Sequence, residues 1–435
     1  MKSMGIDVGT TTISAVVMDT QDKKVLESKT VPNNSFITTG QDWERIQDVS
    51  VVIAQAFQVI DELLARHADI GSIGLTGQMH GIVYTDEKGL DVSPLYTWQD
   101  GRGNLAGDKD SVVDEIRKRC NLTVASGYGV VTHIYNQKNG LVPEKAVSFC
   151  TIGDYLGMRL CSRTRPLIHI SNAASLGFFD GKNARFDSGK TELMNVNQDM
   201  LPEVTADFDR LGEYKGIPVT VALGDNQASF LGSVGLQENV LLLNMGTGGQ
   251  ISVLSDEYFE APGIEARPIV RDRFILVGSS LCGGRAYAIL ERFLRAYAIA
   301  AGAPDQCQYG IMEELALKGA GKEDAMSVET TFQGTRADPS LRGAVTNLSA
   351  ENFTPEGLIY GVLKGMSAEF YRMYEVIRKG TGIQAEHIVA SGNGYRMNKM
   401  LQQISAEMFR AELTLAPYQE EAACGAAISS MENIT

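Results

Sequence analysis

The alternation of apolar and polar positions predicts strands and helices that follow one another along the chain. Residues 3–8 and 12–19 are β-rich runs joined by a Gly-Thr turn, which predicts an antiparallel hairpin. Apolar residues recur at helical spacing over 44–66, which predicts a long amphipathic helix. The mixture predicts an α/β fold with helices covering sheets. Further strands are expected within 71–85, 217–223, 240–254 and 386–391, and further helices over 284–301, 357–379 and 398–413.

One turn occurs in both halves of the chain. Asp7-Val8-Gly9-Thr10 and Asn244-Met245-Gly246-Thr247 each contain an Asx, an apolar residue, a Gly and a Thr in the same order, between two apolar runs. These residue types suit any hairpin turn, but four matched positions in order favour a duplication. We therefore expect two domains, 1–218 and 219–435, with a linker near 210–220 where polar, Gly and Pro residues precede a strand.

Composition narrows the range of partners. The chain has 435 residues, and its 39 basic and 53 acidic side chains give a net charge of −14, which argues against binding nucleic acid or an anionic membrane through bulk charge. An anionic substrate stays open, because backbone amides and a divalent cation can bind it locally. The six scattered cysteines predict free thiols. With neither a secretory leader nor an 18-residue apolar stretch, a cytoplasmic protein is expected.

The two matched turns are candidate phosphate sites. Residues 9–12 offer a glycine, three threonine hydroxyls and backbone N–H groups that can hold phosphate oxygens. Asp7, at the adjoining strand end, can hold a hydrated Mg²⁺. Residues 244–249 repeat the pattern. Two such hairpins would face one polyphosphate across a cleft.

Two further glycine motifs need to be separated from known nucleotide fingerprints. Gly189-Lys190-Thr191 resembles the end of a P-loop, but the upstream glycine is absent and no apolar strand precedes it, so a surface loop is expected. Gly392-Asn393-Gly394 follows a predicted strand and opens a helix, but the third glycine of a dinucleotide fingerprint is missing. This turn suits the adenine and ribose of a nucleotide or a plain tight turn equally well.

A carboxylate and two polar clusters are candidates for substrate chemistry. Asp225 follows the strand 217–223 and fits either a general base or the N-cap of a helix beginning near Gln227; locally the cap is favoured. Residues 77–81 (GQMHG) and 98–102 (WQDGR) supply amide, imidazole, indole, carboxylate and guanidinium groups suited to binding a polyol. His133 and His169 stand alone and are expected to be structural.

Taken in order, these motifs resemble the FGGY carbohydrate kinases of the actin/hexokinase/Hsp70 superfamily. The resemblance covers nearly the whole chain and includes the segments 4–19, 74–81, 98–102, 171–175, 224–234, 244–254, 332–343, 391–409 and 420–427. It implies two ribonuclease-H-like domains, with mixed sheets flanked by helices, around a central cleft. It also implies transfer of the γ-phosphate of ATP to a sugar hydroxyl.

The resemblance assigns roles residue by residue. It makes Asp225 the catalytic base instead of a cap and Asp7 the residue that organises Mg²⁺, largely through water. The ATP site would comprise Asp7, Gly9, Thr10, Thr11, Thr12, Gly246, Thr247, Gly248, Gly392, Asn393, Gly394 and Asn398. The sugar pocket would comprise Gln78, Met79, His80, Trp98, Asp100, Arg102, Asp225 and Asn226.

The resemblance is nearest to the xylulose and sedoheptulose kinases, and TWQDGR favours sedoheptulose. Two departures concern the sugar: His169 stands where an acidic residue is common, and the chain is short for the family. The alternatives are a glycerol or gluconate kinase and a nucleotide-switch protein like actin or Hsp70; a nicotinamide dehydrogenase is disfavoured. The expected partners are a sugar and ATP, with no nucleic acid, no membrane and at most a second copy in a homodimer.

Overall fold

The chain folds into two compact units. The structure is a computed structural model that describes residues 1–107, 110–321, 326–335 and 338–431. The first unit comprises Met1–Gly235, Arg267–Asp272 and Tyr418–Thr435, and the second comprises Leu236–Ala266 and Arg273–Pro417. The expected boundary at 218/219 falls inside the first unit, and the chain enters the second unit at Leu236.

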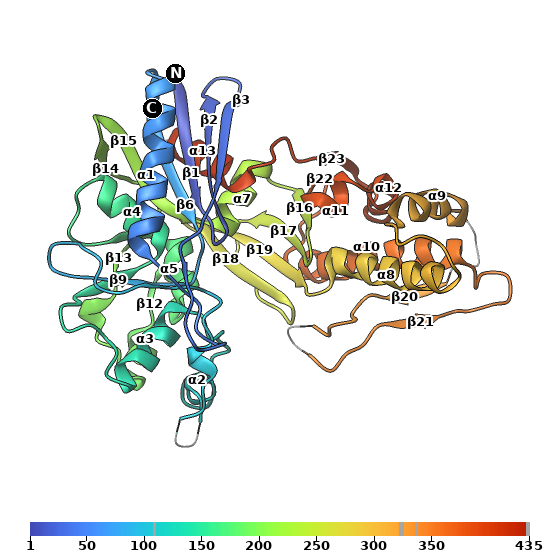
Figure 1. Cartoon of the computed structure of the whole chain (residues 1–435), viewed down its shortest axis with the longest axis horizontal. Coiled ribbons are helices and arrows are strands. Elements are labelled where there is room, and N and C mark those ends of the chain that lie inside the picture. The colour runs from blue at the N-terminus through green and yellow to red at the C-terminus, as the bar shows by residue number, and fades with distance from the viewer. Residues whose placement is uncertain (108–109, 322–325, 336–337, 432–435) are drawn as a thin grey trace. The chain divides into compact units, whose positions relative to one another are not determined.

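The first unit is built on a mixed sheet with the order β14-β15-β6-β1-β2-β3 among the described residues (Figure 1). β1 pairs antiparallel with β2 and parallel with β6, and β6 pairs parallel with β15. The expected linker segment forms the β14–β15 hairpin at one edge, where antiparallel pairing ties it into the sheet. The strand bounds are β1 Lys2–Val8, β2 Thr12–Asp19, β3 Val25–Pro32, β6 Ile70–Gly77, β14 Arg210–Tyr214 and β15 Ile217–Gly224.

The sheet of the second unit repeats this arrangement, with the order β18-β19-β17-β16-β22-β23. β16 pairs antiparallel with β17 and parallel with β22, as β1 does with β2 and β6. The matched turns of the sequence therefore join equivalent strands of two similar sheets. The bounds are β16 Val240–Met245, β17 Gly249–Ser255, β18 Ile264–Val270, β19 Arg273–Ser280, β22 His387–Ser391 and β23 Glu412–Leu415.

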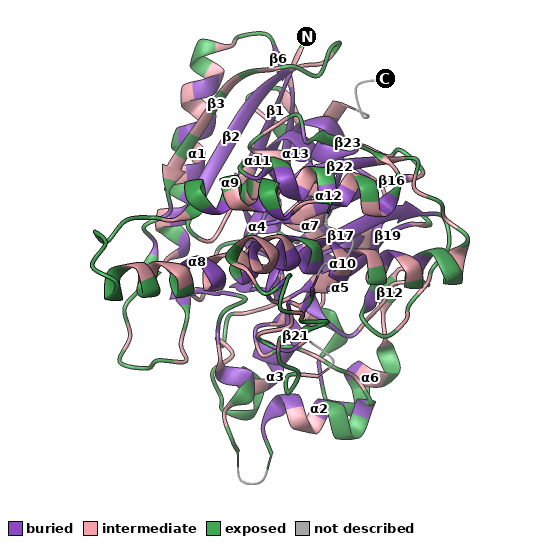
Figure 2. Cartoon of the chain, turned by 90° about the vertical axis from the view of Figure 1, so that its right-hand side faces the viewer, coloured by how far each residue is buried: buried purple, intermediate pink, exposed green. Residues whose placement is uncertain are grey.

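Each unit has its own apolar core between sheet and helices. Figure 2 shows β1, β2, β17 and β19 in the buried colour. The principal helices of the first unit are α1 Val49–Arg66, α2 Val112–Cys120, α3 Gly129–Lys138, α4 Ile152–Leu160, α5 Ile170–Leu176, α6 Ser188–Leu193, α7 Asp225–Ser233 and α13 Glu421–Met431. Those of the second unit are α8 Gly283–Ala300, α9 Tyr309–Gly319, α10 Pro355–Thr381, α11 Gly392–Arg396 and α12 Lys399–Phe409.

Short strands complete the description. In the first unit they are β4 Phe36–Ile37, β5 Ile46–Gln47, β7 Val83–Thr85, β8 Leu95–Tyr96, β9 Ser148–Cys150, β10 Leu167–His169, β11 Phe179–Asp180, β12 Arg185–Phe186 and β13 Glu203–Thr205. In the second unit they are β20 Ser327–Glu329 and β21 Ala344–Thr346. β5 lies between β4 and β8 in a small separate sheet.

The helix α13 returns to the first unit after the whole of the second unit (Figure 1). It packs against β1 and α7 at backbone contact distance. A Cβ added to Gly425 would lie 1.8 Å from the carbonyl oxygen of Ala228, and one added to Gly5 would lie 1.8 Å from that of Ala423. Glycine is required at such contacts because any side chain would collide with backbone. α13 is therefore part of the core of the first unit.

Three predicted elements need correction. The helix expected from residue 44 begins at Val49, because Asp48 caps it by accepting hydrogen bonds from the N–H groups of Ser50 and Val51 at 2.9 and 3.3 Å. The helix expected over 398–413 ends at Phe409, where Arg410 adopts φ 54° and β23 follows. The loop expected at 189–191 is helix α6, which is capped by Asp187.

Two other expectations can be compared directly with the structure. All six cysteines are free, as predicted. Within the described part of the chain, no helix combines the length and apolar character needed to cross a membrane.

Candidate active site

The first loop, between β1 and β2, has its carbonyl groups bonded to neighbouring segments. The Val8 carbonyl accepts from the N–H of Gln78, and the Thr11 carbonyl accepts from the N–H of Asn33, at 3.0 and 2.8 Å. The carbonyls of Gly9 and Thr10 accept side-chain amides of Asn33 and Gln47, each at 2.9 Å. Among the described residues, the N–H groups of Thr10 and Thr11 have no backbone acceptor. Such a loop presents donors, which suits an anion.

In the second loop, between β16 and β17, the carbonyl groups are likewise bonded and N–H groups are left without a backbone acceptor. The carbonyls of Gly246 and Thr247 accept from the N–H groups of Gly284 and Arg285 in the first turn of α8, at 3.0 and 3.1 Å. The N–H groups of Thr247 and Gly248 have no backbone acceptor in the part of the chain that the structure describes. Two loops predicted from one repeated motif thus share one hydrogen-bonding arrangement.

The turn at 392–394 packs closely against the end of β16. Gly392 has φ 80°, and a Cβ there would lie 2.5 Å from the carbonyl oxygen of Met245. Gly394 also lies against Met245. Asn393 is exposed, whereas Asn398 is buried and caps α12 by accepting from the N–H of Leu401 at 2.9 Å. The turn therefore lies beside the second loop, and Asn398 also has a structural role.

Asp7 and Asp225 extend from the carboxyl ends of strands in the same sheet. Asp7 pairs with Thr76 of β6, and Thr76 pairs with Leu223 of β15. Burial raises the pKa of Asp7 to about 7, and the nearby charges of Asp225 and Glu420 add to this shift. Like charges in a desolvated site raise a carboxyl pKa in this way. The structure thus places two functional candidates within electrostatic reach of each other.

Asp225 is the first residue of α7 and not its cap. The N-cap residue is Gly224, and no side chain of the residues that the structure describes caps this helix end. Burial raises the pKa of Asp225 to about 6, although the N–H of Asn226 and the charge of Arg267 act in the opposite direction. Arg267 donates to the Asn226 side-chain oxygen at 2.8 Å. A carboxylate with a pKa near 6 is a stronger base than an ordinary aspartate.

The segment 78–80 is held between β6 and α5. Gln78 is buried. Met79 lies against Gly224: a Cβ added to Gly224 would be 2.6 Å from the terminal methyl carbon of Met79. His80 has φ 72°, a strained conformation for a residue with a side chain. Its N–H donates to the Ser175 hydroxyl at 3.1 Å, its Nδ1 lies 2.7 Å from the Ser175 carbonyl oxygen, and its ring stacks on Tyr128. These contacts fix the imidazole next to the strand end that carries Asp225.

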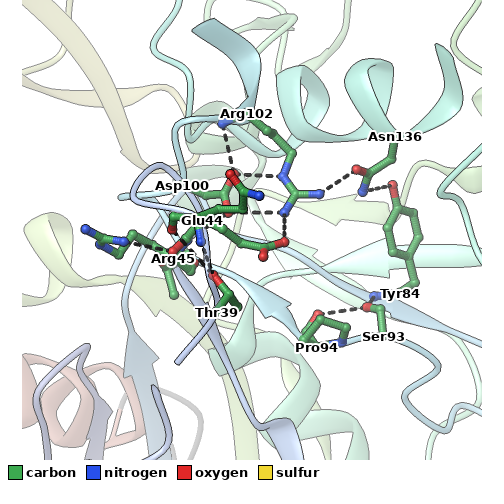
Figure 3. Close-up of polar contacts among 11 residues, drawn as sticks. Thr39, Glu44, Arg45, Tyr84, Ser93, Pro94, Asp100, Arg102 and Asn136 are labelled. Carbon is green, nitrogen blue, oxygen red and sulfur yellow. Dashed lines mark hydrogen bonds and ion pairs between the residues drawn. The ribbon is translucent and has the colours of Figure 1, made fainter. Parts of the chain in front are cut away.

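Asp100 and Arg102 form a buried ion pair (Figure 3). Arg102 Nε and Nη2 donate to Asp100 Oδ1 and Oδ2 at 2.7 and 3.2 Å, and its Nη1 donates to Asn136 Oδ1 at 2.7 Å. The N–H groups of Arg102 and Arg45 also donate to Asp100. The four acceptor positions of this carboxylate are therefore occupied within the chain. This geometry favours a role in positioning the loop that carries Trp98.

Trp98 remains open to solvent, with 48% of its surface exposed. Its indole N–H donates to the Thr10 hydroxyl at 3.0 Å, so the candidate sugar cluster contacts the first loop directly. The exposed part of the indole ring can contact an apolar face of a ligand.

The two lone histidines have structural surroundings, as expected. Burial lowers the pKa of His133 to about 4, and its Nδ1 lies 3.0 Å from the Tyr84 hydroxyl. Burial lowers the pKa of His169 to about 3. His169 caps α5 by accepting a hydrogen bond from the N–H of Ser171. The acidic residue that is common at this position could accept the same hydrogen bond.

Sequence reasoning did not identify Gln47, Asn33 or Ser175. Each holds a candidate residue in place through a hydrogen bond to backbone. Gln47 and Asn33 lie in segments without a recognisable motif, so local pattern carries no indication of their contacts. Ser175 lies in the segment 171–175, which resembles the family, but the resemblance assigns no role to this residue.

Family models match both halves of the chain. A model described as FGGY family of carbohydrate kinases, N-terminal domain, matches residues 3–232, and the corresponding C-terminal domain model matches residues 241–431.

Individual relatives extend over nearly the full chain. A sedoheptulokinase from Mus musculus is 26% identical, covering 92% of this chain and 91% of the relative. A glycerol kinase from Streptococcus pyogenes is 23% identical, covering 98% of this chain and 86% of the relative. The crystal structure of xylulose kinase from Rhodospirillum rubrum superposes with a TM-score of 0.84 at 21% identity, covering 99% of this chain and 89% of that chain. The two-domain α/β fold is thus that of these kinases.

Proposed function

The chain belongs to the FGGY family of carbohydrate kinases and is an ATP-dependent sugar kinase, and we propose that it phosphorylates a terminal hydroxyl of a ketose with Asp225 as the general base. The observation that carries this proposal is the Asp225 carboxylate itself. It lies at a strand end, its pKa is raised to about 6, and it adjoins the segment 78–80.

In the proposed reaction, Asp225 hydrogen-bonds the sugar hydroxyl and accepts its proton. The sugar oxygen forms a bond to the γ-phosphorus while the bond from that phosphorus to the β,γ-bridging oxygen breaks, which releases ADP. Phosphoryl transfer depends mainly on alignment and charge neutralisation. The raised pKa makes Asp225 a better proton acceptor while leaving it mostly ionised above pH 7.

The free N–H groups of the two loops are the proposed phosphate donors. Thr10 and Thr11 supply them in the first unit, and Thr247 and Gly248 supply them in the second. In the second unit, the turn that contains Gly392 and Gly394 packs on the end of β16 beside the second loop, and this position supports an adenosine site there.

Asp7 fits a role in holding a hydrated Mg²⁺. Its Oδ1 is buried and has no hydrogen-bond partner within the described part of the chain, and such an oxygen is a suitable acceptor for metal-bound water. Among the described residues, no three metal-ligating side chains come together, which fits an ion held mainly by water and phosphate oxygens. When bound, the ion would neutralise charge on the phosphates. Asp7, with its pKa near 7, would be ionised by the ion's positive charge.

The sugar site is proposed to comprise the segment 78–80, the Trp98 ring, Asp225 and Asn226. The sedoheptulokinase relative and the resemblance of the motifs 77–81 and 98–102 both support a ketose. The glycerol kinase relative supports the alternative of a smaller polyol.

A coupled ADP-release assay over C5 to C7 ketoses, glycerol, gluconate and aldoses with MgATP tests the proposal. We expect kcat/KM to be highest for a ketose, with sedoheptulose and xylulose first. A preference for glycerol or gluconate would refute the ketose assignment but keep the kinase. In the variant Asp225→Asn, no sugar should stimulate ADP release. The variant should still bind ATP, as measured with a fluorescent ATP analogue.

A further inference from the structure

A closed ring of three hydrogen bonds joins the first loop to the segment 78–80. The Gln47 amide nitrogen donates to the carbonyl oxygen of Thr10 at 2.9 Å. The Gln78 amide nitrogen donates to the Gln47 amide oxygen at 2.8 Å. The Thr10 hydroxyl closes the ring by donating to the Gln78 amide oxygen at 3.3 Å.

The direction of every bond in this ring is fixed by one backbone group. A carbonyl oxygen can only accept, so Gln47 must turn its NH₂ group toward Thr10 and its oxygen toward Gln78. Gln78 must then present its NH₂ group to Gln47 and its oxygen to Thr10. The Thr10 hydroxyl must therefore donate to Gln78, and its oxygen is left to accept from the indole N–H of Trp98. Flipping any one amide would bring two acceptors or two donors together.

Gln47 is held rigidly enough to impose this order. It is completely buried. Its strand β5 pairs with β8, in which Leu95 lies opposite Gln47, and the chain continues from β8 to Trp98. On the other side, Asp48 caps α1. Gln47 thus reaches Thr10 from β5, and Trp98 reaches it from the turn that follows the adjacent strand β8.

We propose that Gln47 is a positioning residue that orients the Gln78 amide and the Thr10 loop together, so that occupation of the sugar pocket and of the phosphate loop are coupled. This inference rests on the proposed function. It also revises one assigned role: the Thr10 hydroxyl proton is committed to Gln78, so the Thr10 side chain does not donate to phosphate. The exposed hydroxyls of Thr11 and Thr12 remain available for that purpose.

The test compares Gln47→Glu with a matched control. Gln47→Glu keeps the shape but places a carboxylate oxygen against the Thr10 carbonyl, which breaks the ring. The control is Gln55→Glu. The Gln55 side-chain amide donates to the backbone carbonyl of Pro32, so this variant also loses a bond from a side-chain amide to a carbonyl, but the bond lies outside the ring. The measurements are kcat, KM for sugar, KM for ATP, and the factor by which saturating sugar lowers KM for ATP.

We expect Gln47→Glu to raise KM for the sugar at least tenfold and to reduce the coupling factor to near one, while Gln55→Glu stays within twofold of wild type. Thermal unfolding shows whether each variant folds. If Gln47→Glu does not fold, Gln47→Met replaces it. A folded Gln47 variant with wild-type KM and coupling would overturn the inference. A wild type that phosphorylates no sugar would instead overturn the proposed function.

A double-mutant cycle separates the ring from a direct phosphate contact of Thr10. If the ring acts as one unit, Thr10→Val combined with Gln47→Met should cost no more activity than the worse single variant. Thr10→Ser, which keeps the hydroxyl, should restore activity to within about threefold of wild type. Losses that multiply in the double variant would mean that the Thr10 hydroxyl binds phosphate independently, and the proposed coupling would then be wrong.

Discussion

Replacing Asp225 with asparagine is expected to lower turnover by several orders of magnitude and to stabilise the fold at the same time. The substitution preserves the shape of the side chain and removes its charge. Burial raises the pKa of Asp225 from 3.8 to about 6, and this value already includes the opposing effects of Asn226 and Arg267. A difference of about two between the folded and unfolded pKa corresponds to at most about 3 kcal/mol of unfavourable ionisation in the folded state.

The pH range of this effect follows from the direction of the shift. Below about pH 4 the carboxyl is protonated in both states, so its ionisation costs no stability. As the pH rises from about 4 to 6, the unfolded chain ionises more readily than the folded chain and stability falls. Above pH 6 the full cost remains. Asp225→Asn should therefore raise the free energy of unfolding by about 2 to 3 kcal/mol at pH 8 and have little effect at pH 4.

Urea unfolding at pH 4, 6 and 8 measures the stability of the variant, and the coupled ADP assay measures its turnover. Loss of a general base should lower kcat by about 10² to 10⁴-fold. Asp48→Asn is the control, because hydrogen bonding from Ser50 lowers the pKa of Asp48 and its neutralisation should bring no gain at pH 8. An Asp225→Asn variant that is no more stable than wild type at pH 8, or equally stabilised at pH 4, would refute the electrostatic reasoning. Near-normal turnover would refute the assignment of the base.

Three further outcomes follow from the structure. The kcat/KM of the wild type should fall about tenfold per pH unit below a midpoint near pH 6, since Asp225 must be ionised to accept a proton; a flat profile from pH 5 to 8 would contradict this. Gly425→Val should destabilise the first unit by about 3 kcal/mol or more in thermal unfolding, because α13 would be displaced. The control Gly310→Ala has open space around its Cβ within α9 and should be neutral or slightly stabilising. Arg102→Met should leave Asp100 buried without its cation and cost about 3 to 5 kcal/mol in urea unfolding, whereas wild-type stability would show that the ion pair is dispensable.

The hairpins and loops of the fold could be predicted because their information is local. Apolar runs flanking an Asx, a Gly and a Thr define both β1–β2 and β16–β17 from sequence. The sequence does not locate the start of α1, because the apolar period continues before Asp48 and the capping role of Asp48 depends on side-chain geometry. The helix α6 was missed because its six residues are too few to show a period.

Candidate site residues could be selected from the sequence only where they lie in motifs, and their roles stay predictions. The surroundings that raise the pKa of Asp7 and Asp225 depend on which strands are neighbours in the sheet, and strand order is a long-range property. The same holds for Gln47, which lies 31 residues before its partner Gln78. At Asp100 the motif alone is misleading. The motif suggests that Asp100 binds the sugar, but the acceptor positions of its carboxylate are occupied by groups of the chain itself.

The return of α13 to the first unit has a consequence for how the protein is made. α13 is held to β1 by the Ser3 hydroxyl, which donates to the Ala427 carbonyl at 2.9 Å and lies 2.7 Å from the Ser430 hydroxyl. On the ribosome, residues 236–417 must all be synthesised before α13 appears. Until then, the face of β1 that α13 covers has no partner. The unit translated first is therefore the one completed last, and its nascent sheet must be kept from aggregating throughout synthesis of the other unit.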